Sequence, residues 1–297
     1  FATLTAISGR PSGNCSQCGK TSVSGHGEAM KQFVDGLVLD MLEIRRRRPL
    51  VFSMTNFVVM NETANALLAV GASPVMSDAI EEAVEMAGIS SALVLNIGTL
   101  YPRSVDSMVE AGRAANRKGI PVVLDPVGAG ATRLRTDSAR RILSEVDVTI
   151  LRANQGEAMA VAGLESRVRG VDSVDDIGQF TDIAIRIAEG IGCPVAVTGR
   201  TDVITDGSQT WLCDNGHPLL QAVTGTGCTV TALVGAFLAV NPDVTRAAAG
   251  ALGLFGMCGE LAAQGARGPG SFEIALRDFL WSVEEEQVRA GVKVRRP

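Results

Sequence analysis

The chain has 297 residues, 46% of them hydrophobic, which is enough to bury one large α/β core or two ordinary ones. Its formal net charge of −5 and its single short basic run argue against a nucleic-acid surface, but they allow a nucleotide bound in a local site. Six cysteines are too few for a disulfide framework, and no apolar run reaches the ~20 residues that cross a bilayer, so we expect a cytoplasmic protein without a membrane partner.

Residues 1–27 are rich in Ser, Thr and Gly, contain no acid, and begin with Phe. This composition is compatible with an organellar transit segment, an expression remnant or a disordered tail, and it does not distinguish among them. Cys15 and Cys18 have the spacing of a metal or redox pair, but without a second pair we assign them no chemistry. We expect a tail over residues 1–27 and one domain over residues 28–297.

A helix is predicted from Glu28 onward, where Phe33, Leu37, Met41 and Ile44 recur at helical spacing. Four arginines at residues 45–48 follow, where positive charge suits a helix C-terminus. We therefore interpret this basic run as a helix end and not as a phosphate or targeting site.

Short apolar runs then alternate with longer amphipathic segments, which is typical of βαβ units. Four of the runs are apolar on both pleat faces, as strands buried between two helix layers must be: SALVLNIG, IPVVLDPV, DVTILRAN and PVAVTGR. The stretch 201–216 predicts a hairpin at the sheet edge, and the chain from Thr229 onward is helix-rich. The sequence thus predicts an α/β fold with a mainly parallel central sheet and helices on both faces.

Polar residues end four of these runs, at the sheet edge where open α/β folds bind ligands. They are Asn96 with Gly98 and Thr99, Asp125, Arg152 with Asn154 and Glu157, and Thr198 with Gly199. An ionised Asp directly after a buried strand costs free energy unless a cation meets it. Asp125 is therefore a candidate metal or substrate contact, and a capping role in the next turn is the alternative.

The segment RANQGE places Asn154 and Glu157 on one face of a helical first turn. The same spacing is that of an ordinary capping box. Together with Asp125, however, Glu157 could hold Mg²⁺ through its waters beside a nucleotide's phosphates, and Arg152 would supply a fixed positive charge for phosphate oxygens.

The segment TGTGC precedes a long apolar helix, and Gly225 and Gly227 would let backbone N–H groups converge at the positive helix end. We predict that residues Gly225, Thr226 and Gly227 stabilise a phosphoryl group in transfer, close to Asp125 and Glu157. The segment lacks the lysine of a Walker motif and the third glycine of a dinucleotide turn.

Cys228 stands at the same helix end, which would favour a thiolate. It could accept the proton of an attacking hydroxyl, or only contact that hydroxyl, because a loose phosphoryl transfer needs little base strength. A small buried cysteine without chemistry is the other interpretation.

Taken together, these segments resemble the hydroxyethylthiazole kinase family of the ribokinase-like superfamily, from about Arg48 to residue 285. The resemblance lies in TNFVVMNETANALLAVGASPVM (55–76), LVLNIGTL (93–100), PVVLDPVGAGAT (121–132), RANQGE (152–157), AVTG (196–199), NGHPLLQAVTGTGC (215–228) and GPGSF (268–272). It implies phosphorylation of 4-methyl-5-(2-hydroxyethyl)thiazole by ATP with Mg²⁺, in thiamine biosynthesis or salvage.

The resemblance also implies roles for particular residues. The family's thiazole pocket falls on Asn56, Val58, Met76, Gly98 and Gly225. Its ATP contacts fall on Arg152 and Thr198, and its Mg²⁺ region on Asp125 and Glu157. Cys228 stands where many ribokinase-like relatives carry a general-base Asp. Family members form trimers with the thiazole pocket at the subunit boundary, which implies a homotrimer here.

Three other functions fit the sequence less well. A hydroxymethylpyrimidine or pyridoxal kinase would share the fold, but TNFVVMN and GASPVM disfavour it. A nucleotide-sensing module without turnover has no need of Asp125, Glu157 and Arg152 arranged for in-line transfer. A nicotinamide-dependent dehydrogenase would show a glycine fingerprint near its first strand, and the sequence has none there.

Overall fold

The computed structural model describes residues 21–164 and 177–297, and the side chains of residues 27 onward within them. The pair Cys15 and Cys18 and most of the expected tail lie outside these ranges. Helix α1 (Thr21–Arg47) begins earlier than Glu28, so the expected boundary between tail and domain falls inside this helix. The division of the chain into tail and domain stays a prediction.

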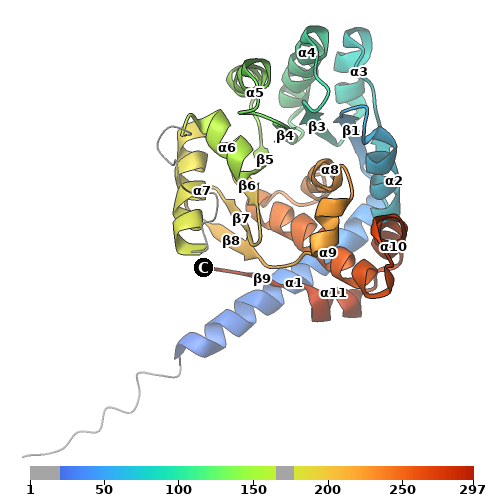
Figure 1. Ribbon diagram of the computed structural model, residues 1–297, viewed down its shortest axis with the longest axis vertical. Helices are drawn as coiled ribbons and strands as arrows, with labels where there is room; N and C mark the ends of the chain where they lie inside the picture. Colours follow the sequence, from blue (N-terminus) through green and yellow to red (C-terminus); the bar gives the residue numbers. More distant parts are fainter. Residues whose placement is uncertain (1–20, 165–176) are drawn as a thin grey trace, which may run out of the picture.

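One sheet runs through the middle of the described chain (Figure 1). Its strands are β1 (Leu50–Met54), β2 (Ser73–Val75), β3 (Ala92–Asn96), β4 (Val122–Asp125), β5 (Ile150–Asn154), β6 (Val195–Thr198), β7 (Asp202–Thr205), β8 (Thr210–Cys213) and β9 (Val294–Arg295). They are ordered β2-β1-β3-β4-β5-β6-β7-β8-β9. The pairs from β2 to β6 are parallel and those from β6 to β9 are antiparallel, which confirms the mainly parallel sheet.

Helices cover both faces of this sheet (Figure 1). Besides α1 they are α2 (Met60–Val70), α3 (Ile80–Ile89), α4 (Pro102–Lys118), α5 (Arg133–Glu145), α6 (Gln155–Ala162), α7 (Ile177–Ile191), α8 (Thr226–Leu238), α9 (Val244–Gly265), α10 (Pro269–Ser282) and α11 (Glu285–Gly291), with a 3₁₀ turn η2 (Pro218–Ala222). Helices α3 to α7 pack on one face, and α1, α2 and α8 to α11 on the other. Within the described ranges, no helix combines the length and apolarity of a membrane span.

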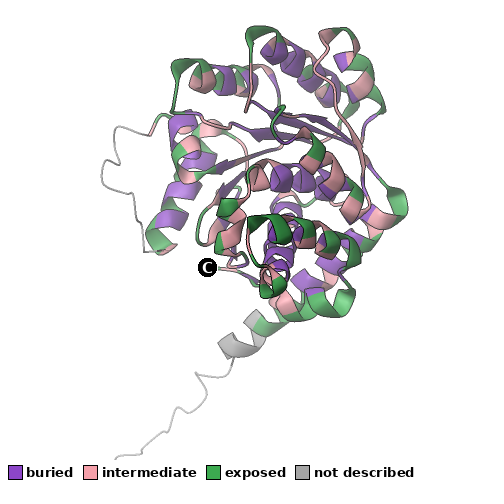
Figure 2. Cartoon of the chain, turned by 45° about the vertical axis from the view of Figure 1, so that its right-hand side comes forward, coloured by how far each residue is buried: buried purple, intermediate pink, exposed green. Residues whose placement is uncertain are grey.

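Strand β3 explains why the runs are apolar on both pleat faces. Leu93 and Leu95 pack into the core beneath α3 to α7, whereas Val94 between them packs into the core beneath α8 and α9. All three side chains are at most 1% exposed, and buried residues fill the sheet between the two helix layers (Figure 2). A strand covered on both sides cannot show the alternation of a half-exposed strand.

The predicted hairpin is present as β7 and β8, but it does not form the sheet edge. The C-terminal strand β9 pairs with β8 and takes that edge, and the Arg296 guanidinium lies 3.6 Å from the Trp211 ring centroid. The sequence did not reveal β9 because a two-residue strand is too short to show any periodicity.

Helix α8 is the expected buried helix, and it includes the last three residues of the TGTGC segment. Its residues from Thr229 to Leu238 are all buried. A Cβ atom placed on Gly235 would lie 2.7 Å from Val94 Cγ2 of β3, so this glycine lets the helix lie directly against the sheet. The close packing fixes the position of the helix start relative to the strand ends.

We expect Gly235→Val to destabilise the fold by about 2 kcal/mol or more, because the added carbons must displace a close-packed strand. The matched control is Gly190→Val on α7, where no heavy atom of the described residues lies within 4 Å of the added Cβ. Chemical denaturation of both variants measures the difference. Equal stability of the two would show that Gly235 does not set the helix-to-sheet distance.

Candidate active site

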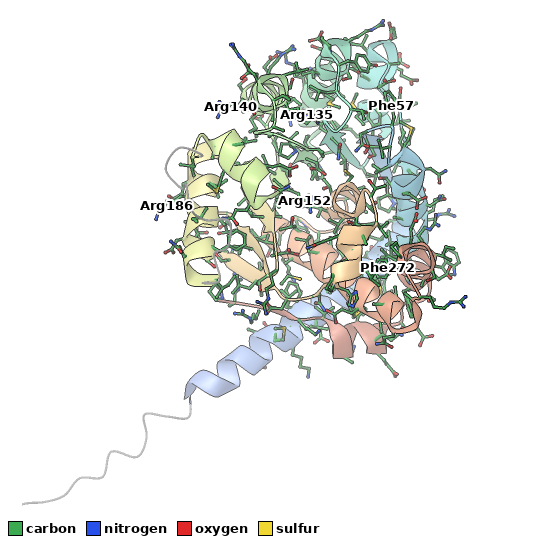
Figure 3. The ribbon with its side chains drawn as sticks, in the orientation of Figure 1. Phe57, Arg135, Arg140, Arg152, Arg186 and Phe272 are labelled. Atoms are coloured by element: carbon green, nitrogen blue, oxygen red, sulfur yellow. The ribbon has the colours of Figure 1, made fainter. Side chains whose placement is uncertain are left out.

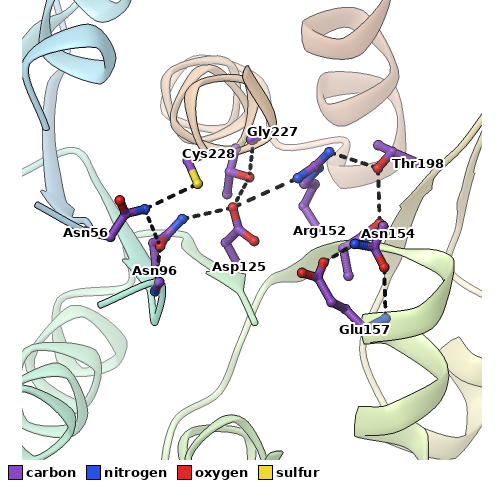
Figure 4. A network of polar contacts seen from close by, with 12 residues as sticks. Asn56, Asn96, Asp125, Arg152, Asn154, Glu157, Thr198, Gly227 and Cys228 are labelled. Atoms are coloured by element: carbon purple, nitrogen blue, oxygen red, sulfur yellow. Dashed lines mark hydrogen bonds and ion pairs between the residues drawn. The ribbon is translucent and has the colours of Figure 1, made fainter. Parts of the chain in front are cut away.

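The predicted polar strand ends meet at the carboxyl edge of the sheet. Asn96 is the register partner of Asp125, and Asn154 is the register partner of Thr198. The structure therefore brings together side chains that lie up to about a hundred residues apart in the chain, on four adjacent strands (Figure 4).

Asp125 lies at the centre of this group and is only 1% exposed. Its Oδ2 atom accepts hydrogen bonds from Thr231 Oγ1 (2.7 Å) and Asn96 Nδ2 (3.0 Å), and lies 4.0 Å from Arg152 Nη1. Its Oδ1 atom is buried and has no hydrogen-bond partner among the described residues. Burial raises the pKa of Asp125 to about 6, although Arg152 and Thr231 oppose the shift.

Asn96 connects Asp125 to the loop after β1. Its Oδ1 atom accepts hydrogen bonds from Asn56 Nδ2 (3.1 Å) and from the Gly98 amide (2.9 Å). Asn56 Nδ2 also lies 3.3 Å from Cys228 Sγ. A continuous set of hydrogen bonds thus runs from Asp125 to the cysteine (Figure 4).

Thr231 was missed by the sequence analysis because it lies within an apolar helix. Its hydroxyl contacts Asp125 and also lies 3.0 Å from the Gly227 carbonyl of the preceding turn. A threonine four residues after the second glycine of TGTGC is on the same helix face as that glycine, and this spacing was the available signal.

Two glycines of the predicted thiazole pocket are required by close approach. A Cβ on Gly98 would lie 2.7 Å from Asn56 Nδ2. Gly225 has φ 80°, which favours glycine, and a Cβ there would lie 2.0 Å from Val59 Cγ1. Both positions therefore hold the loop after β1 against the site.

The other two members of that predicted pocket are placed differently. Val58 is 64% exposed and its neighbour Phe57 is 60% exposed. Met76 follows edge strand β2 and packs, partly buried, against the core on the α8 side of the sheet. The thiazole-binding roles of Val58 and Met76 stay predictions.

Helix α8 begins at Thr226, inside the TGTGC segment that was expected to precede it, with Gly225 as its N-cap. The first turn leaves the N–H groups of Thr226, Gly227 and Cys228 without intrahelical acceptors. Thr226 Oγ1 donates to the Leu220 carbonyl, which fixes the turn. A Cβ on Gly227 would lie 2.8 Å from Arg152 Nη1, so the glycine admits the guanidinium beside these amides. Positive charge and free donors converge here.

Arg152, on β5, lies beside this turn and lines a cavity of about 780 Å³. Its Nη2 atom donates to Thr198 Oγ1 (2.8 Å). Besides these two residues the cavity is lined by, among others, Gly199, His217, Leu220, Gly227 and Phe255. Its size is in the range of nucleotide and cofactor sites, and it combines apolar walls with the Arg152 guanidinium beside the start of α8.

Asn154 and Glu157 form the capping box that was the alternative interpretation. Asn154 Oδ1 accepts from the Glu157 amide (2.9 Å), and Glu157 Oε2 accepts from the Asn154 amide (3.0 Å). Glu157 Oε1 also accepts from the Gly128 amide (2.8 Å). Each carboxylate oxygen keeps a lone pair, so Glu157 is held at the rim of the site and can still bind a water of a hydrated cation.

Cys228 differs from the thiolate that the helix end suggests. Burial, together with the nearby charge of Asp125, raises the pKa of the thiol to about 11, although Asn56 and Asn96 oppose the shift. The thiol is therefore protonated at neutral pH. The positive helix end does not decide the protonation state here, because the sulfur is desolvated beside an acid.

We expect Asp125→Asn to raise the stability of the ligand-free protein near neutral pH by up to about 3 kcal/mol. The pKa of Asp125 (about 6) lies above the ordinary value of 3.8, so the folded state binds the proton more tightly and loses stability as pH rises through this range. Asparagine does not ionise, and the difference should vanish below about pH 4. Denaturant unfolding at several pH values measures it.

The control for this experiment is Asp137→Asn on α5, an exposed residue that forms an ion pair with Arg133. It should show no such gain near neutral pH. A gain for Asp125→Asn that is equally large at low and neutral pH would contradict the assigned cause.

Comparison with known proteins supplies the family. Residues 41–286 match the model of the hydroxyethylthiazole kinase family. The hydroxyethylthiazole kinase of Desulforudis audaxviator (strain MP104C) is 50% identical over 256 residues, which cover 86% of this chain and 94% of that protein. The solved hydroxyethylthiazole kinase of Pyrococcus horikoshii OT3 has a TM-score of 0.82 at 45% identity, over 89% of this chain and 99% of that one.

More distant structures agree in fold alone. A ribokinase-like superfamily protein from Enterococcus faecalis V583 has a TM-score of 0.56 at 14% identity, over 78% of this chain and 86% of that one. The sheet order, the site at its carboxyl edge and these matches lead to one conclusion: the chain belongs to the hydroxyethylthiazole kinase family and has the ribokinase-like fold.

Proposed function

We propose that the protein transfers the γ-phosphoryl group of ATP to the primary alcohol of 4-methyl-5-(2-hydroxyethyl)thiazole, in thiamine biosynthesis or salvage. Family membership supports the reaction. The observation that carries it for this chain is the contact of Thr231 with both Asp125 and Gly227, which joins a buried acid to the turn with free N–H groups. Phosphoryl transfer depends on positioning and charge stabilisation, and the contact between Asp125 and this turn would supply both.

The nucleotide side is the cavity between Thr198 and the 3₁₀ turn η2. Its apolar walls, which include Leu220 and Phe255, suit a purine base. Arg152 would bind phosphate oxygens, and Thr198 holds the guanidinium in place through its hydroxyl. The amides of residues 226–228 would stabilise the charge on the transferred group.

The residues present fit a hydrated Mg²⁺ ion. Asp125 Oδ1 is a buried oxygen without a partner among the described residues, and Glu157 stands fixed at the rim. No cluster of three or more His, Cys, Asp or Glu side chains occurs in the described part of the chain, so the ion would take its other ligands from water and phosphate. When bound, it would neutralise charge on the nucleotide's phosphates.

The alcohol side is formed by Asn56, Gly98 and Cys228. Asn56 Nδ2 is directed to Asn96 and to Cys228 Sγ, so the cysteine is held as a hydrogen-bond acceptor. A thiol with a pKa of about 11 is a poor general base at neutral pH. We infer that Cys228 contacts the hydroxyl. Most of the rate enhancement would then come from the alignment of the alcohol with the phosphoryl group.

A homotrimer with the site at a subunit interface is part of the proposal. Phe57 and Val58 are large apolar side chains that lie mostly in solvent, on the same loop as Asn56. Apolar residues exposed at the rim of a site suggest that another chain covers them.

The four cysteines of the described residues are free thiols, which supports a reducing compartment.

The assay uses the thiazole alcohol with MgATP, following ADP release and the mass of the phosphorylated thiazole. We expect kcat/KM to fall by about 10²-fold or more for Asp125→Ala and Arg152→Ala, because each removes charge at the transfer site. The control Arg113→Ala breaks only surface ion pairs, with Glu110 of α4 and Glu145 of α5, and should retain activity. Pyridoxal and a hydroxymethylpyrimidine are the competing acceptors, and faster turnover of either would replace the proposed substrate.

Cys228→Ser separates contact from base catalysis. We expect kcat to stay within about tenfold of the unaltered protein, because the amides of the turn and the site's alignment remain. A loss of about 10³-fold or more in steady-state kcat would instead show that the sulfur accepts the proton.

A further inference from the structure

We propose that Arg135 is a positioning residue for this reaction: its guanidinium cross-links the two loops that carry the alcohol side and the carboxylate side of the site. The inference rests on the proposed function for its kinetic meaning. Its structural content, that one side chain fixes the separation of two loops, does not depend on which alcohol is phosphorylated.

The cross-link consists of three hydrogen bonds to backbone carbonyls. Arg135 Nη1 donates to the carbonyls of Ile97 (3.1 Å) and Val127 (2.7 Å), and Nη2 donates to the carbonyl of Gly98 (2.7 Å). Ile97 and Gly98 belong to the loop after β3, and Val127 to the loop after β4. A planar, rigid fork of donors is suited to hold several acceptors in a fixed arrangement.

Each of these loops carries part of the site. In the loop after β3, the Gly98 amide donates to Asn96 Oδ1, and Gly98 lies against Asn56. In the loop after β4, the amide of Gly128, three residues after Asp125, donates to Glu157 Oε1. Arg135 therefore sets the distance between the groups proposed to hold the alcohol and those proposed to hold the metal.

The stem of Arg135 is also fixed. A Cβ placed on Gly128 would lie 2.9 Å from Arg135 Cδ, and Gly128 has φ 75°, so this position favours glycine. The start of α5 is tied to the same loop, because the Gly130 amide donates to Thr136 Oγ1 and the Arg135 amide donates to Thr132 Oγ1. The guanidinium thus projects from a rigid base.

Arg140 on the same helix offers a matched comparison (Figure 3). Its guanidinium also donates to two backbone carbonyls, of Ala160 (2.7 Å) and Val161 (3.1 Å). These carbonyls end α6 and belong to neither site loop. Removing Arg140 deletes the same kind of bond without touching the proposed alcohol or metal groups.

The kinetic experiment compares Arg135→Ala, Arg135→Lys and Arg140→Ala in the thiazole alcohol assay. We expect Arg135→Ala to lose about 10²-fold in kcat/KM for the alcohol, because small displacements of reacting groups are costly. The KM for MgATP should change less, since Arg135 touches none of the residues named at the nucleotide cavity. Methylguanidinium should restore part of the activity of Arg135→Ala, and methylammonium should not. Arg135→Lys should be intermediate, and Arg140→Ala near normal.

Hydrogen exchange, measured by mass spectrometry without substrate, tests the cross-link itself. In Arg135→Ala, peptides over residues 97–101 and 126–131 should exchange faster, whereas Arg140→Ala should affect only residues near 160–164. Unchanged exchange in the two loops, or equal activity losses in Arg135→Ala and Arg140→Ala, would overturn the proposal. If the unaltered protein does not phosphorylate the alcohol, the proposed function fails, and the exchange result still decides the role of Arg135.

Discussion

The site depends on one costly interaction, the burial of the Asp125 carboxylate between the sheet and helix α8. Only one of its oxygens has partners among the described residues, and Arg152 stands 4.0 Å away, too far for a close ion pair. Protonation of this carboxyl, or a positive group at its other oxygen, would recover part of the free energy that the burial costs. Under the proposed function, that positive group is a hydrated cation.

The same acid explains the state of the cysteine. A thiol at a helix start is expected to ionise readily, yet Asp125 and burial both oppose a second negative charge nearby. A second negative charge beside Asp125 would add to the cost of burying the first. The arrangement therefore commits its negative charge to Asp125 and leaves Cys228 neutral, as a polar contact that Asn56 orients.

The fold could be predicted from the sequence because its buried strands have a clear pattern. Val94 and its neighbours are apolar on both faces, and polar residues such as Asp125 end the runs. What could not be predicted depends on contacts between distant segments. Strand β9 is too short to show a pattern. Thr231 lies within an otherwise apolar helix, so its contact with Asp125 could not be predicted. Local spacing favours a thiolate at Cys228, but burial is a property of the folded chain.

Precise placement at this sheet edge comes from backbone contacts more than from side chains that touch ligand. Glycines at positions 98, 225 and 227 let neighbouring groups approach more closely than a Cβ would allow. Such close approach makes the loops stiff only if their carbonyls and amides are also held, which Thr226 and Arg135 do from α8 and α5. In the loop after β1 the Phe57 amide is held by Thr99 Oγ1, but the side chains of Phe57 and Val58 lie mostly in solvent. In the proposed homotrimer, a second copy of the chain would cover these two side chains.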